Sequence, residues 1–333
     1  PLFEELSPAA LTGQRIKGCE GRQKSGMDRV ALRFRAPLKG PGNRMCEKPH
    51  REDIVGGQAV IEGVMMRHGD KIAVAVRTPD KDIEIREQTY VSLTRRYQAL
   101  GVKCVRGFVA LLEMMVIGIK TLLYSADVAM KYEAKKPPKW HTVVSLLTGV
   151  AMAIFLFIVI PAYLFSILRA YVESTILLNV IEGCIRLSIF LGFLASTLLM
   201  SDMRRVYMYH GAEHKTVFAW ENGQALTVEN IRAFSTRHPR CGTSFMMIVI
   251  VISILVFSLL GRPDFIQRVF YKLMLLPVVA GISYEVIRLT GKYRERPWAA
   301  FLSWPGLLLQ KITTREPTDD QIEVAIEALK KVT

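Results

Sequence analysis

The chain has 333 residues, of which 50% are hydrophobic and 22% charged, and its formal net charge is +14. This mixture predicts long apolar segments separated by charged ones, and the positive charge favours contact with a membrane surface or a nucleic acid. No helix-turn-helix or RNA-binding signature is present, which argues against a nucleic-acid partner. The five cysteines are scattered, which argues against a disulfide framework and favours a reducing compartment.

The first 52 residues differ from the rest of the chain. They are basic, rich in glycine and proline, and without hydrophobic periodicity, so we expect a disordered leader. They lack the apolar core of a signal peptide. Met45 lies just before the organised part and is a candidate natural start, which would make residues 1–44 an upstream extension.

Residues 53–100 are predicted to form a small cytoplasmic region that contains β-structure. Residues 71–76 and 83–86 alternate between apolar and polar side chains, and Thr78-Pro79-Asp80 lies between these two runs. This pattern is typical of a β-hairpin. A glycine-punctuated apolar stretch, residues 56–67, precedes the hairpin.

Residues 105–129 are apolar except for four charged side chains spaced seven residues apart. These are Arg106, Glu113, Lys120 and Asp127, which fall on nearly one face of a helix. Lipid would not tolerate such a face on its own. Two interpretations remain open: an amphipathic helix that lies along the membrane, or a re-entrant or spanning helix that lines a polar cavity.

Four further apolar segments have roughly the length that crosses a bilayer. They are residues 142–167, 177–200, 244–261 and 269–290. Lysine and arginine gather before the first segment, between the second and third, and after the last, so these parts are predicted to be cytoplasmic. Residues 101–297 therefore form a predicted membrane domain with a cytoplasmic loop at 201–243. We expect a mainly α, multi-pass protein of the inner (cytoplasmic) membrane with cytoplasmic N- and C-termini.

Residues 298–333 are predicted to be an interfacial segment followed by a cytoplasmic helix. Trp298 and Trp304 flank a short apolar piece, as in an anchor at the membrane surface. Thr318 and Gln321 have the spacing of a capping box, and apolar residues follow at helical intervals. This predicts an amphipathic C-terminal helix on the cytoplasmic side.

The predicted cytoplasmic loop begins with a motif typical of metal sites. His210-Gly211-Ala212-Glu213-His214 has the form H-x-x-E-H. On a helix the two histidines lie on one face and can reach the same ion, while Glu213 can serve as a base, as a ligand or as a partner of a ligand. The motif predicts metal-dependent chemistry, with Glu213 as the candidate catalytic residue.

The other end of the same loop supplies two more candidate ligands, His238 and Cys241. A turn at Asn222-Gly223 and a short helix begun by Thr227 would fold these residues back onto the motif. Imidazole and thiolate together suit a divalent metal, with Zn²⁺ as the first choice. The competing interpretation is that the histidines bond the backbone or lipid headgroups and that Cys241 is a small buried apolar residue.

Acidic residues elsewhere give weaker signals. Glu182 and Arg186 are one helical turn apart in the second span, which predicts a mutually satisfied ion pair. Glu285 lies near the cytoplasmic end of the last span, and Glu62 lies in the glycine-punctuated stretch. Both are additional candidate ligands. The alternatives are an ion pair at a helix end for Glu285 and a solvated loop carboxylate for Glu62.

Residues 57–67, 210–214, 238–244 and 316–321 together resemble the YqhQ-like family of bacterial membrane proteins. The resemblance runs from about residue 53 to the C-terminus. That family has no established function and is described as predicted metal-dependent enzymes. The resemblance implies a metal site built from His210, Glu213, His214, His238 and Cys241, and it implies no particular substrate.

Three functions are compatible with these patterns. The first is a hydrolase-type metalloenzyme at the cytoplasmic membrane face, in which Glu213 moves a proton and the substrate is membrane-embedded or lipid-linked. The second is a non-catalytic assembly or sensor protein with a closed structural zinc, whose partner would be a membrane protein. The third is a transporter, although no internal repeat supports it.

Overall fold

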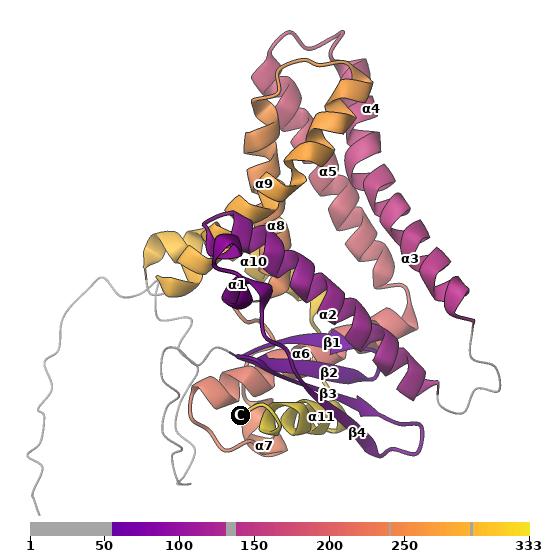
Figure 1. Cartoon of the computed structure of the whole chain (residues 1–333), viewed down its shortest axis with the longest axis vertical. Helices are drawn as coiled ribbons and strands as arrows, with labels where there is room; N and C mark the ends of the chain where they lie inside the picture. Colours follow the sequence, from indigo (N-terminus) through magenta and orange to yellow (C-terminus); the bar gives the residue numbers. More distant parts are fainter. Residues whose placement is uncertain (1–54, 131–137, 240, 294–295) are drawn as a thin grey trace, which may run out of the picture. The chain divides into compact units, whose positions relative to one another are not determined.

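The computed structural model describes residues 55–130, 138–239, 241–293 and 296–333. The predicted leader and its candidate start at Met45 lie outside these residues. The protein is mainly helical and carries one antiparallel sheet near the N-terminal side (Figure 1). Its strands are β1 (Val55–Val60), β2 (Gly63–His68), β3 (Lys71–Arg77) and β4 (Ile83–Thr89).

The helices follow the sheet in the chain. They are α1 (Leu93–Arg96), η2 (Gln98–Gly101), α2 (Val105–Ala129), α3 (Lys139–Ile154), the π-helical turn η3 (Phe155–Val159), α4 (Ile160–Leu168), α5 (Thr175–Thr197), α6 (Ser201–Glu221), α7 (Val228–Arg232), α8 (Gly242–Ser258), α9 (Phe265–Lys292), α10 (Pro297–Thr313) and α11 (Asp319–Lys330). The predicted mainly α fold with a small β element is confirmed.

The sheet has the order β1-β2-β3-β4, with every neighbouring pair antiparallel. The predicted hairpin corresponds to β3 and β4. The glycine-punctuated stretch forms a second hairpin, β1 and β2, which its sequence pattern does not predict. Glycine is disfavoured in strands, and the turn between β1 and β2 contains Glu62 at φ 51°, a conformation that is unusual for a residue with a side chain.

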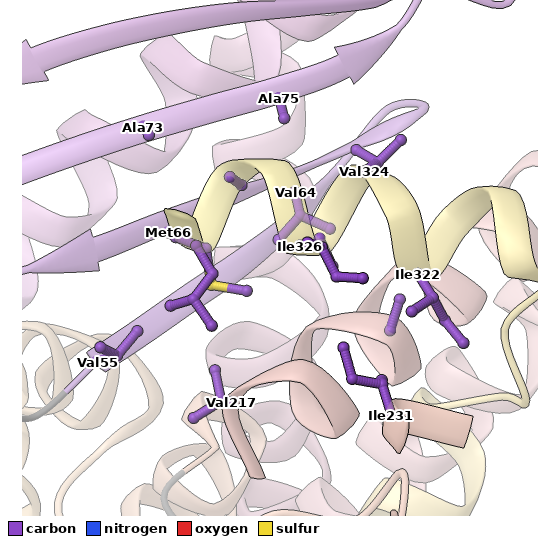
Figure 2. Close-up of a cluster of buried hydrophobic side chains, with 14 of the residues drawn as sticks. Val55, Val64, Met66, Ala73, Ala75, Val217, Ile231, Ile322, Val324 and Ile326 are labelled. Atoms are coloured by element: carbon purple, nitrogen blue, oxygen red, sulfur yellow. The ribbon is translucent and has the colours of Figure 1, made fainter. Parts of the chain in front are cut away.

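Both faces of the two central strands, β2 and β3, are buried, whereas β4 is mostly exposed. Val64 and Met66 of β2 and Ala73 and Ala75 of β3 point to one side, where residues of α6, α7 and α11 complete a hydrophobic core (Figure 2). The labelled members from these helices are Val217, Ile231, Ile322, Val324 and Ile326. Met65, Ile72, Val74 and Val76 point to the other side, where Ile117 and Val128 of α2 cover them. The sheet therefore lies between α2 and the layer formed by α6, α7 and α11.

Helix α2 has one face on the protein and one apolar face exposed. Buried Glu113 accepts hydrogen bonds from Tyr90, Ser92 and the backbone of Leu93. The opposite face exposes apolar side chains, namely Leu112, Met115, Val116, Leu122 and Leu123. Since its C-terminal half packs along a sheet that cannot enter lipid, this arrangement favours the interpretation of α2 as a helix along the membrane.

Four helices among the described residues are long and apolar enough to cross a membrane. They are Val105–Ala129, Trp140–Leu168, Thr175–Thr197 and Phe265–Lys292. The last three correspond to predicted spans. The predicted span 244–261 corresponds to α8, a shorter apolar helix of 17 residues. Membrane-spanning character is thus supported by length and composition, and α2 meets the same length criterion although its packing favours an interfacial position.

Residues 298–333 contain α10 and α11, and α11 is the predicted amphipathic helix. Trp298 and Trp304 of α10 are exposed. The capping box at the start of α11 is present, with the backbone N–H of Thr318 donating to Oε1 of Gln321 at 3.0 Å. The buried face of α11 contacts β2, β3 and α6.

Replacing Thr318 with alanine should destabilise α11 by about 1 kcal/mol, because the first turn loses the side chain that caps it. Hydrogen exchange of the α11 amides would measure this change. Glu327→Ala, which removes only a surface ion pair with Lys330 in the same helix, is the control. Equal amide protection in the two variants would contradict a stabilising role for the capping box.

Candidate metal centre

Helix α6 carries the H-x-x-E-H motif and is flanked by different partners on its two sides. The region predicted as a loop at 201–243 contains this helix of 21 residues and the short α7, which is capped by Thr227 as expected. On one side of α6, Arg205 and Tyr209 contact Glu62 at the β1–β2 turn. On another side, the rings of His210 and His214 lie next to each other, with centroids 4.4 Å apart.

The orientation of His210 is fixed by two neighbours. Its Nδ1 lies 2.8 Å from the carbonyl oxygen of Thr313, at the end of α10, and its Nε2 lies 3.1 Å from Sγ of Cys241. A carbonyl oxygen can only accept, so Nδ1 carries the hydrogen and, in the neutral ring, Nε2 presents its lone pair to the sulfur.

The second histidine, His214, repeats this arrangement. Its Nδ1 lies 2.5 Å from the carbonyl oxygen of Thr236, so its Nε2 also presents a lone pair. This Nε2 is buried and has no partner in hydrogen-bond geometry within the described part of the chain. Burial lowers the pKa of His214, and the neighbouring Cys241 opposes that shift. The neutral, metal-binding form of the imidazole is therefore favoured.

Cys241 completes a group of three candidate ligands. It caps the N-terminus of α8, is buried, and its sulfur also contacts the hydroxyl of Thr243 at 3.2 Å. The ligand atoms of His210, His214 and Cys241 all lie within 4.8 Å of one another. The thiol of Cys241 carries a single hydrogen, so it can donate to only one of the two imidazole nitrogens that present a lone pair. A hydrogen bond from the thiol thus cannot satisfy both histidines. The donor set therefore fits a metal ion, which would bind all three atoms at once.

His238 lies beside this group without belonging to it. Its backbone is held by Gln310 of α10 through two hydrogen bonds of 2.7 and 2.8 Å. Its buried ring contacts Phe218 and His214, with centroids 4.5 and 5.8 Å away, and its Nε2 lies 3.5 Å from Oε1 of Glu221. His238 and Cys241 therefore lie next to the H-x-x-E-H motif, as predicted. Nε2 of His238, however, is directed to the carboxylate of Glu221.

Glu221 was not among the predicted site residues. It lies on α6 seven residues after His214 and eleven after His210, which is close to a whole number of helical turns. Extending the motif along the same helix face would have revealed it.

Glu213 points to the sheet. Its side chain lies against Gly57 of β1, where an added Cβ would come within 2.8 Å of both Cγ and Oε1 of Glu213. Burial raises the pKa of Glu213, and the nearby His210 and His238 and the backbone N–H of Gly57 oppose the shift. The carboxylate is not part of the three-residue group, although the side chain is buried on the same helix.

The two additional candidate ligands are held by arginines. Glu62 pairs with Arg205 through bonds of 2.6 and 2.5 Å, and Glu285 pairs with Arg106 through bonds of 2.7 and 2.6 Å. Neither carboxylate joins the group of His210, His214 and Cys241 in the described structure.

Comparisons with known proteins identify the family. The uncharacterized protein YqhQ of Bacillus subtilis (strain 168) is 33% identical to this chain over 295 residues, which cover 83% of this chain and 91% of that protein. No solved structure matches. A family model described as a protein of unknown function (DUF1385) matches residues 102–333, which include α6, Cys241 and the segment that contacts His210. The predicted resemblance is confirmed at this level, and the chain belongs to the DUF1385 family.

Proposed function

We propose that this protein is a metalloprotein of the inner membrane that binds Zn²⁺ through His210, His214 and Cys241. The observation that carries the proposal is the matched orientation of the two imidazoles. Each donates its Nδ1–H to a backbone carbonyl, which leaves Nε2 as the available ligand atom, and the ligand atoms of both rings lie within 4.8 Å of the buried sulfur. Metal-binding histidines in proteins are commonly held in this way, because the second hydrogen bond fixes the tautomer and the ring.

The finer proposal is a hydrolase that acts at the cytoplasmic face. Three protein ligands leave one coordination position open, as in catalytic zinc sites. When bound, zinc supplies Lewis acidity for hydrolysis. Glu213 is proposed to hold and transfer the proton, because it is the acidic residue of the motif and is buried beside His210. Cys241 caps an apolar helix, which supports a membrane-embedded or lipid-linked substrate.

A structural zinc is the second candidate, and the burial of the site favours it. His214 is 2% exposed and His238 is 4% exposed. A rotation of the His238 ring away from Glu221 would offer a fourth ligand and close the site. The ion would then stabilise the junction of α6, α8 and α10 directly, as structural zinc sites do. The protein would serve as an assembly or sensor component without catalysis.

The metal proposal is tested by elemental analysis of the full chain. Protein purified in detergent without a histidine tag and without chelators should contain about one zinc per chain. We expect His214→Ala to lose most of this zinc, because one of three ligands is removed. The matched control is His141→Ala, which removes an exposed histidine in α3. Equal zinc in both variants, or no stoichiometric metal in the wild type, would refute the site.

Glu213→Gln separates the two candidate roles. Both candidates predict that this variant folds and keeps its zinc, since Glu213 is not one of the three grouped ligands. The hydrolase proposal predicts that it fails to replace the wild type in a strain that needs the protein, with a loss of about 100-fold or more for a proton-transferring residue. Full replacement by the zinc-loaded variant would rule out the proposed role of Glu213 and favour the structural zinc.

A further inference from the structure

Four charged side chains meet inside the apolar helices, apart from the candidate metal centre. Glu182 and Arg186 belong to α5, and Arg268 and Lys272 belong to α9. We call these four residues the buried charge cluster. The side chains of Arg268 and Lys272 are 0% exposed, that of Glu182 is 3% exposed and that of Arg186 is 8% exposed.

Glu182 is the shared anionic partner of the cluster. The predicted ion pair with Arg186 is present, with 2.9 Å between Nη2 and Oε1. Nη2 of Arg268 donates to Oε2 of the same carboxylate at 2.5 Å, and Nζ of Lys272 donates to Oε1. No other carboxylate among the described residues pairs with these cations. When all three basic side chains are protonated, one negative charge faces three positive charges, and two positive charges are not compensated.

The remaining contacts of the cluster are neutral. Arg186 donates to the carbonyl of Phe157, within the π-helical turn η3, and to Ser253 of α8. Arg268 donates to Asn179 and to the carbonyl of Gly261. Aromatic rings add cation–π contacts: Arg268 lies over Phe165, and Arg186 and Lys272 lie over Phe257. These contacts orient the cations without cancelling their charge.

Uncompensated charges are costly in a medium that water does not reach, and ionisable residues inside apolar helices are retained chiefly for function. We propose that the buried charge cluster binds an anion of the phosphate class. Two positive charges would be balanced by a phosphate dianion. They would also be balanced by a phosphodiester, which carries one negative charge, together with a second anion. The planar guanidinium groups of Arg186 and Arg268 suit the paired oxygens of phosphate.

The buried charge cluster lies away from the candidate metal centre. Arg268 contacts Gly261 in the connection between α8 and α9, whereas the candidate metal centre lies at Cys241, at the opposite end of α8. The proposed anion site is therefore separate from the metal centre. A free phosphate from solution and the phosphate of a lipid headgroup share the same chemistry, and experiment can distinguish them.

The test uses the full chain in a neutral maltoside detergent, with bound lipid removed. Binding is measured by calorimetry, and by the shift in unfolding temperature, with sodium phosphate, with phosphatidylglycerol in mixed micelles, and with sodium chloride at equal ionic strength. We expect saturable binding of phosphate or of phosphatidylglycerol, and the one that binds identifies the source. Chloride that is as effective as both, or no binding of any of the three, would overturn the proposal.

Substitutions within the buried charge cluster test whether the anion binds there. Lys272→Met should weaken binding about tenfold, since it removes one charge-assisted hydrogen bond. Lys292→Met, on an exposed residue of the same helix, should leave affinity unchanged. If Lys272→Met does not fold, Arg268→Lys keeps the charge but removes the paired donors, and it should also bind about tenfold less tightly. Wild-type affinity in a folded cluster variant would place the anion elsewhere and reject the assignment.

Discussion

Glu182→Gln should unfold at a much lower temperature than the wild type and lose about 3–5 kcal/mol of stability, because it leaves buried charges without their partner. The carboxylate of Glu182 accepts from Arg186, Arg268 and Lys272, all of them buried. A glutamine side chain keeps the size but carries no charge. The three cations would then face only neutral groups and one another.

The stability of Glu182→Gln can be measured as the temperature at which half of the detergent-solubilised protein leaves the monodisperse peak in size-exclusion chromatography. Asp264→Asn is the control, because Asp264 pairs with Arg169 at the surface and is 74% exposed. We expect this control to change stability by less than about 1 kcal/mol. If the two variants behave alike, Glu182 does not hold the cluster together.

Gly211→Ala is expected to destabilise the protein and to release the metal. A Cβ on Gly211 would lie 2.0 Å from the carbonyl oxygen of Arg315, and this is a contact with backbone rather than with a movable side chain. The segment that follows α10 lies along α6 here, since the N–H of Arg315 donates to the carbonyl of Tyr207 at 2.9 Å. Thr313, whose carbonyl orients His210, is the last residue of α10 and directly precedes this segment.

An alanine at position 211 must therefore push the segment away from α6. Overpacking of this kind costs about 1–3 kcal/mol, and a clash with backbone favours the upper end. Zinc content and unfolding temperature would both fall. Gly149→Ala is the matched control, because a Cβ there meets nothing within 4 Å and alanine is the better helix former. A Gly211→Ala protein with normal zinc and stability would show that the segment does not position His210.

The core of the candidate site could be predicted from the sequence because it depends on local spacing. His210 and His214 are one helical turn apart, and the turn after α6 returns Cys241 to them. The partners of the imidazoles could not be predicted, since the carbonyls of Thr313 and Thr236 act through the backbone and any residue type could provide them. Their role depends on the tertiary packing of α6 against α10 and the loop after α7.

In the rest of the fold, too, features that depend on local spacing can be predicted from the sequence, whereas contacts between distant segments cannot. The C-terminal capping box is a local signal and is predicted correctly, whereas the strands β1 and β2 are not predicted, because they contain glycine, which is disfavoured in strands. Glu182 and Arg186 are neighbours on one helix, so their pair was predicted. Arg268 and Lys272 reach the same carboxylate from α9, a contact between distant segments that spacing does not encode.

The layered arrangement of the sheet has a consequence for the order of events during biosynthesis. Strands β1–β4 are made before all the apolar helices, yet the helices that cover one of their faces, α6 and α11, follow α5 and α10 in the chain. Contacts between such distant segments form slowly. The nascent strands must therefore wait, with one apolar face uncovered, until the membrane helices have been made. We therefore expect that shielding Val64 and Met66 in that interval, by a chaperone or by the bilayer surface, increases the yield of folded protein.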